Sequence, residues 1–149
     1  MTTTTRQPPE IFSLRSPYLS EGRSDAVIAR TEQITVRLKV YAEGGENALH
    51  AHMEEDHAFI ILEGEATFYD HEDTPRVVGP NRGIMLPAGN YYRFESTGDT
   101  NLVILRVGTG KPKGRNDRVS LEGEPLPSDD EANKKVPGVP IPGRYFGDD

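Results

Sequence analysis

The sequence lacks cysteine, tryptophan and any long apolar run. Without cysteine, the chain can form neither disulfide bonds nor thiolate metal sites. A membrane-spanning helix requires about 20 consecutive apolar residues, so no membrane partner is expected. Residues 1–9 are rich in threonine and carry no apolar signal core, and the expected location is therefore the cytoplasm.

Basic residues are also fewer than acidic residues. The chain has 17 Lys and Arg against 24 Asp and Glu, and its formal net charge is -7 at pH 7. Nucleic-acid phosphates are bound by clustered lysine and arginine, and the sequence shows no basic stripe. Nucleic acid is therefore excluded as a partner, and most of the acidic excess serves to keep the surface soluble.

Apolar residues make up only 34% of the 149 residues, so they must be concentrated in one part of the chain. Residues 1–24 are polar and predict an extended N-terminal arm. Residues 25–110 are dense in strand signals and predict one domain with one core. Residues 111–149 form a tail rich in proline, glycine and charge, in which only a short helix at 129–135 could form. Five tail residues could pin it to the domain or to a second subunit: Val136, Val139, Ile141, Tyr145 and Phe146.

The middle region predicts short β-strands separated by turns. Apolar and polar residues alternate between Ile34 and Val40, which is the period of a strand buried on one face. The apolar run 58–62, the turn at 63–64 and the return at 66–69 predict a β-hairpin. Short strands at this regular spacing, without a long helical period, predict an all-β sandwich or barrel. Further strands are expected at residues 49–53, 77–78, 84–86, 91–94 and 102–107.

Three of the four histidines lie within nine residues of each other. His50 and His52 are two residues apart, so on a strand both imidazoles point to one face. His57 begins the following strand and can supply a third nitrogen if that strand pairs beside the first. Three imidazoles suit zinc, iron, nickel, copper or manganese. The alternative is a chance pair of surface histidines, which a third histidine at such short range disfavours.

The segment 44–64 resembles the first sequence motif of the cupin superfamily, G-x5-H-x-H-x4-E-x6-G. Gly44, His50, His52 and Gly64 stand at their places in the motif. His57 stands where the family usually has glutamate. The resemblance therefore implies a metal site whose ligand set is His50, His52 and His57.

The second cupin motif, G-x5-P-x-G-x2-H-x3-N, is matched in part. Pro87 and Gly89 align with it, whereas Asn81, Tyr92 and Ser96 replace the first glycine, the histidine and the asparagine. The resemblance covers residues 33–107. It implies an all-β fold, the double-stranded β-helix or jelly-roll barrel of cupins, with the N-terminal arm and the Pro-rich C-terminal tail outside it.

The two departures from the motifs shape the predicted site. Tyr92 stands at the fourth corner, where it could ligate the metal as a phenolate, hydrogen-bond a bound water or substrate, or cap the pocket. Three neutral imidazoles leave the charge of the metal uncancelled, which favours a small anionic or chelating substrate. Open positions on the metal suit oxygen activation or Lewis-acid catalysis.

The resemblance implies one divalent metal ion per chain, with iron as the first choice. It predicts a metal-dependent dioxygenase that acts on a small molecule, with Tyr92 as the candidate catalytic residue. The alternatives are a metal-dependent isomerase, lyase or cyclase that does not use oxygen, and a non-catalytic cupin that binds a small ligand. A homodimer is also implied, with the arm and the tail packed on the partner.

Several charged residues near the predicted site have two interpretations. An inward arginine could hold an acidic substrate, or its charge could simply be solvated. A carboxylate between the histidines could bind the metal or act as a base, although a solvated loop is the more common case. His71 is expected to be exposed and unrelated to the metal. The candidates are Arg37, Arg93 and Arg106 for the substrate, and Glu54, Glu55 and Asp56 for the metal.

Overall fold

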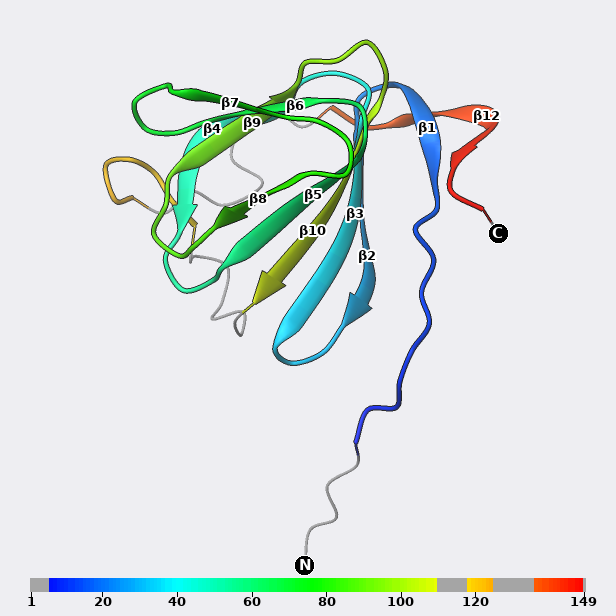
Figure 1. Cartoon of the computed structure of the whole chain (residues 1–149), viewed down its shortest axis with the longest axis horizontal. Coiled ribbons are helices and arrows are strands. Elements are labelled where there is room, and N and C mark those ends of the chain that lie inside the picture. Colours follow the sequence, from blue (N-terminus) through cyan, green and yellow to red (C-terminus); the bar gives the residue numbers. More distant parts are fainter. Residues whose placement is uncertain (1–5, 110–117, 125–135, 149) are drawn as a thin grey trace, which may run out of the picture.

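The computed structural model describes residues 6–109, 118–124 and 136–148 (Figure 1). Within these residues the secondary structure consists of β-strands, and no helix there is long and apolar enough to cross a membrane. The predicted helix at 129–135 lies outside the described residues. The strands are β1 (Ser16–Glu21), β2 (Arg23–Arg30), β3 (Ile34–Tyr41), β4 (Gly45–His52), β5 (His57–Glu63), β6 (Ala66–Tyr69), β7 (Pro75–Val78), β8 (Gly83–Leu86), β9 (Tyr92–Ser96), β10 (Leu102–Thr109), β11 (Arg118–Val119) and β12 (Val139–Phe146).

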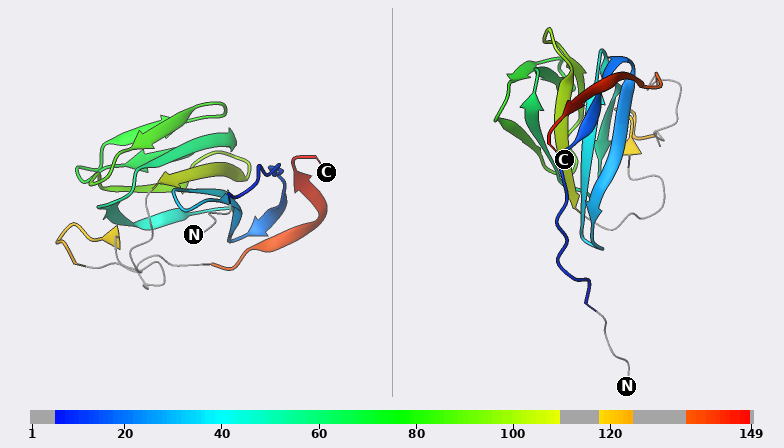
Figure 2. Two further views of the ribbon diagram at one scale, coloured as in Figure 1. Left: turned by 90° about the horizontal axis from the view of Figure 1, so that it is seen from below. Right: turned by 90° about the vertical axis from the view of Figure 1, so that its right-hand side faces the viewer.

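Two five-stranded sheets face each other and form the barrel (Figure 2). One sheet has the order β2-β3-β10-β5-β8 and the other the order β11-β4-β9-β6-β7. The strand pairs within both sheets are antiparallel. This arrangement is the double-stranded β-helix that the sequence predicts. The sheets therefore present two inner faces to each other, and the candidate site lies between them.

The inner core is aromatic. Along β5 the burial alternates with a period of two, so that Phe59 and Ile61 point inward and both are fully buried. The ring of Phe59 lies 5.4 Å from that of Phe68 and 5.5 Å from that of Phe94, measured between centroids. Both partners belong to the opposite sheet, so the aromatic cluster joins the two layers of the barrel.

A second apolar cluster lies on the outer side of the β3–β10 pair. Leu38, Val40 and Val103 are buried there together with Leu19 of β1. β1 pairs with β12, and Phe146 of β12 packs against this cluster. The end of the tail therefore docks on its own barrel, and residues 6–15 run back past β2 (Figure 1), where Nε2 of Gln7 donates a 2.8 Å hydrogen bond to the carbonyl oxygen of Arg30.

The predicted hairpin at 58–69 is wrong. β5 pairs with β10 and β8, whereas β6 pairs with β9 and β7, so the two strands belong to different sheets. The chain crosses between the layers at Gly64, whose φ is 82°. A Cβ atom at this position would lie 2.5 Å from the carbonyl oxygen of Asn101, so glycine is required there. Two apolar runs joined by a short turn produce the same sequence pattern whether the strands pair or cross.

The β6–β7 turn carries a pH-dependent contribution to stability. The carboxylate of Asp70 accepts hydrogen bonds from the backbone N–H groups of Thr74, at 3.0 Å, and Glu72, at 2.9 Å. These bonds, with Arg76 beside them, lower the pKa of Asp70 from 3.8 to about 2. Because the folded-state pKa is depressed, the stabilisation is present above the unfolded-state value and is lost as the pH falls towards the folded-state value.

We therefore expect Asp70→Ala to lower the urea midpoint of unfolding at pH 6. The gap between the variant and the wild type should narrow steadily as the pH falls from 5 towards 2, because the wild-type carboxylate becomes protonated. Asp99→Ala, in another exposed turn, serves as the control. A gap of the same size at pH 6 and at pH 2.5 would contradict this account.

Candidate metal centre

The three predicted ligands converge across the barrel. His50 and His52 lie on β4, with ring centroids 5.1 Å apart. His57 begins β5 in the opposite sheet, and its ring lies 4.2 Å from that of His52. The sequence predicted that His57 would join the other two histidines if β4 and β5 paired side by side, but these strands belong to different sheets. Instead, the closure of the barrel brings the imidazoles together.

The turn of the second motif holds the histidine segment in place. The N–H of Gly89 donates a 2.9 Å hydrogen bond to the carbonyl oxygen of His52, and the N–H of Ala88 donates one of 2.8 Å to the carboxylate of Asp56. The φ of Gly89 is 88°, a conformation that favours glycine. The two motif segments therefore meet at the site.

A group of potential metal ligands includes a carboxylate. One ligand atom from each of His52, Glu55 and His57 lies within 4.8 Å of the other two. His50 is not in this group, so the predicted set of three histidines stays a prediction. Two histidines and one carboxylate, converging on one place, are a donor set that fits a divalent transition metal.

His50 is fixed in one tautomer. Its Nδ1 lies 2.8 Å from the carbonyl oxygen of Ala48, and because a carbonyl only accepts, Nδ1 carries the hydrogen. In the neutral imidazole Nε2 then has the lone pair, and it lies 3.6 Å from Oε2 of Glu46. A second nitrogen that donates to a backbone carbonyl is characteristic of metal-binding histidines. His50 is completely buried and is prepared to ligate through Nε2.

His57 is held by its neighbours on β10 and by the loop before it. Nη2 of Arg106 lies 2.7 Å from Nε2 of His57, and Oε1 of Glu55 lies 3.2 Å from the same nitrogen. Gly108 is the strand partner of His57, and a Cβ atom there would come within 3.1 Å of the imidazole. Gly108 therefore leaves the space that the ring occupies.

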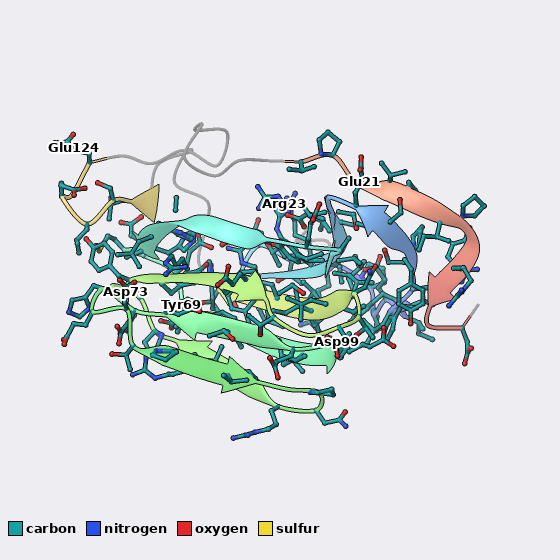
Figure 3. All side chains as sticks on the ribbon, turned by 90° about the horizontal axis from the view of Figure 1, so that it is seen from above. Glu21, Arg23, Tyr69, Asp73, Asp99 and Glu124 are labelled. Atoms are coloured by element: carbon teal, nitrogen blue, oxygen red, sulfur yellow. The ribbon has the colours of Figure 1, made fainter. Side chains whose placement is uncertain are left out.

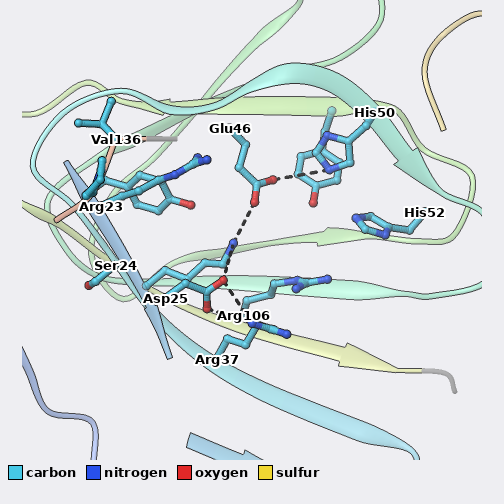
Figure 4. Close-up of a pocket in the computed structure, with 13 residues that line it drawn as sticks. Arg23, Ser24, Asp25, Arg37, Glu46, His50, His52, Arg106 and Val136 are labelled. Carbon is cyan, nitrogen blue, oxygen red and sulfur yellow. Dashed lines mark hydrogen bonds and ion pairs between the residues drawn. The ribbon is translucent and has the colours of Figure 1, made fainter. Parts of the chain in front are cut away.

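A pocket of about 510 Å³ opens beside His50 and His52 (Figure 4). Four cationic side chains, Arg23, Arg37, Lys39 and Arg106, line it together with only two carboxylates, Asp25 and Glu46. Nη1 of Arg37 lies 3.2 Å from Asp25, and Nζ of Lys39 lies 2.9 Å from Glu46. Although the chain as a whole is acidic, the lining of the pocket has an excess of positive charge.

Tyr92 is buried in the wall of this pocket. It is the strand partner of His50, and the two rings lie 4.4 Å apart. Its ring also lies 5.7 Å from that of Phe59. Nearby, burial raises the pKa of Tyr41 well above 10, so that phenol stays protonated at neutral pH. The ring of Tyr92 therefore lies beside His50, and its predicted role at the fourth corner of the site stays a prediction.

The structure separates the charged candidates. Arg37 and Arg106 line the pocket. Arg93 does not, because it pairs at 3.3 Å with Asp73 at the edge of the barrel (Figure 3). His71 is exposed beside Glu72. Sequence reasoning favoured a solvated loop for Glu55 and did not consider Lys39, although the alternation along β3 places Lys39 on the same face as Arg37.

The two facing sheets and the buried histidines define a class of protein, the double-stranded β-helix proteins with a metal-capable pocket. A family model described as the Cupin domain matches residues 37–108. The chain belongs to the cupin superfamily. A search of curated proteins found no match.

Solved structures share this fold. An uncharacterised conserved protein with a double-stranded β-helix domain from Klebsiella pneumoniae is 18% identical, with a TM-score of 0.60, and the match covers 72% of this chain and 95% of that one. A sugar phosphate isomerase of the cupin superfamily from Silicibacter pomeroyi is 22% identical, with a TM-score of 0.58 and coverage of 78% and 94%. KdgF from Halomonas sp. is 17% identical, with a TM-score of 0.53 and coverage of 60% and 81%.

Proposed function

We propose that this protein is a metal-dependent cupin enzyme, a dioxygenase that acts on a small anionic or chelating organic molecule. The observation that carries this proposal is the group His52, Glu55 and His57, with ligand atoms within 4.8 Å of each other, next to a pocket of about 510 Å³ with an excess of cations. Two histidines and one carboxylate with open positions are the ligand set of non-haem iron(II) oxygenases.

The metal would be held by His52, Glu55 and His57, with His50 as a further ligand through Nε2. When bound, it would act as a Lewis acid with open positions for substrate and oxygen. Iron is the first choice, and the same donors can also bind zinc, nickel, manganese or copper.

The remaining residues of the pocket would bind and orient the substrate. The guanidinium of Arg37 can hold a carboxylate or a phosphate through two parallel hydrogen bonds. Phe59 and the ring of Tyr92 would close the inner end of the site to water. We assign Tyr92 as the candidate catalytic residue, because its ring lies 4.4 Å from that of His50 and its hydroxyl is a group that can act in proton transfer.

A metal-dependent isomerase, lyase or cyclase is the second candidate. The carboxylate of Glu46, 3.6 Å from His50, and the phenol of Tyr92 are groups that can move protons inside the pocket. The sugar phosphate isomerase from Silicibacter pomeroyi has the same fold, which supports this candidate, although fold alone does not determine the reaction.

Metal content and oxygen uptake test the proposal. We expect about one metal ion per chain in protein purified without a histidine tag, and its loss in His52→Ala, while the exposed control His71→Ala keeps it. The iron-loaded protein should consume oxygen with a chelating substrate from a panel of diketones, catechols and hydroxy acids.

Turnover without oxygen uptake would favour the second candidate. A chain that binds metal and ligands but turns over nothing would be a binding cupin. The absence of metal even after reconstitution would refute the central proposal. The homodimer and the cytoplasmic location also stay proposals, and a mass near twice 16.5 kDa by light scattering would support the former.

A further inference from the structure

We propose that Arg106 couples the metal to an anionic group of the substrate. Its guanidinium contacts His57, and the binding of a metal to His57 would turn the guanidinium into the pocket, where it would bind a carboxylate or a phosphate. This inference rests on the proposed metal site and identifies the chemistry of the ligand that the site accepts.

The contact between Arg106 and His57 is incompatible with a metal on His57. Nη2 of Arg106 lies 2.7 Å from Nε2 and 3.3 Å from Nδ1 of the imidazole. Since Nη2 is this close to both ring nitrogens, it lies beside the ring rather than on the lone pair of Nε2. A metal ion on Nε2 would nevertheless stand next to the guanidinium, and two positive charges at such short range repel each other. The guanidinium must therefore withdraw when a metal binds Nε2.

Arg106 lines the pocket but pairs with no carboxylate of the described residues. Arg106 lines the pocket beside His52 (Figure 4). Within the described residues, no carboxylate lies within 4.0 Å of its guanidinium, and its buried Nε has no hydrogen-bond partner. A cation in this position can be satisfied by an anion from outside the protein.

The strand register adds a second reason for an anion at this place. Arg106 on β10 is the direct partner of Arg37 on β3, so two guanidinium groups share one face of neighbouring strands. Like charges directly opposite each other are unfavourable. Asp25 offsets the charge of Arg37 at 3.2 Å. An oxyanion between the two arginines would offset the charge of Arg106 and is the ligand that this geometry favours.

Metal and anion should therefore help each other to bind. A metal that displaces Arg106 releases a cation for the anion, and an anion that holds Arg106 in the pocket frees His57 for the metal. Coupling of this kind is reciprocal, and typical values are about 5- to 150-fold in affinity.

Calorimetric titration of the full chain with cobalt(II) tests this coupling in the wild type, Arg106→Gln and the control Arg93→Gln. Arg106→Gln removes the cation that competes with the metal, so it should bind cobalt about tenfold more tightly than the wild type. Acetate and methyl phosphate should tighten cobalt binding to the wild type about fivefold or more, and should have no such effect on Arg106→Gln. The anion with the larger effect identifies a carboxylate or a phosphate ligand. Arg93→Gln should behave as the wild type.

The outcomes separate this inference from the proposed function. If the wild type binds cobalt and Arg106→Gln binds it no more tightly, or if the anions help both proteins equally, the role of Arg106 is refuted and the metal site stands. If neither protein binds cobalt, the proposed function fails. The visible absorption of bound cobalt provides the control, because an anion that ligates the metal directly would change the spectrum of Arg106→Gln as well. Arg106→Lys keeps the positive charge and should retain part of the coupling. This result would show that the effect of Arg106→Gln does not come from a general loss of folding.

Discussion

Replacing Phe59 with alanine is expected to lower the free energy of unfolding by about 3–5 kcal/mol. Phe59 is completely buried, and its ring centroid lies within 5.7 Å of the rings of Phe68, Tyr92 and Phe94. All three partners come from the opposite sheet. Removal of the ring would therefore leave a cavity at the point where the two layers of the barrel are joined.

Urea unfolding of Phe59→Ala and of Met85→Ala would measure this effect. Met85 lies on β8, next to β5, and its side chain is 65% exposed, so its loss should change stability by less than about 0.5 kcal/mol. The same experiment would link the core to the site, because the ring of His57 lies edge-on to Phe59 at 6.3 Å. Phe59→Ala should therefore weaken cobalt binding as well. Equal unfolding midpoints for the two variants would mean that the aromatic cluster does not hold the layers together.

The sequence contained enough information to predict the strands from β3 to β10 but not their pairing. Alternation along 34–40 and the apolar run at 58–62 correspond to β3 and β5 because burial on one face imposes a period of two. The crossing at Gly64 was missed, since a crossing and a hairpin both need a short turn between apolar strands. The strand β12 at 139–146 was missed because of its prolines, which β12 accommodates in a two-stranded ribbon with β1, outside the two main sheets.

The candidate site, like the fold, was predicted from the sequence only in part. His50, His52 and His57 were found because they are close in sequence and match a motif. Glu55 was set aside because its direction depends on how the loop between the sheets turns. Lys39 was missed for a different reason. It lies on β3, which is separated from β5 by β10, and no local sequence pattern predicts this strand order.

Lys39 carries the second large prediction, because it is a buried cation inside the pocket. Its side chain is only 5% exposed, and Nζ lies 2.9 Å from Oε1 of Glu46, whose side chain is 15% exposed. Asp25 is a more distant partner at 3.8 Å, with 42% of its side chain exposed. Removal of one member of a buried ion pair is costly, because the other charge stays in a site of low polarity.

Lys39→Met should therefore lower the free energy of unfolding by about 3 kcal/mol. Glu46→Leu should cost less, about 1–2 kcal/mol, because Lys39 keeps Asp25 as a partner. The double variant should lose less than the sum of the two single variants, since two apolar side chains can replace a buried ion pair at little cost. Urea unfolding of the four proteins measures the coupling directly, and strict additivity would refute the buried pair.

If the double variant is as stable as the wild type, stability alone does not explain the pair. Its place beside His50, in a pocket with an excess of cations, then indicates that the charges serve the binding of the ligand.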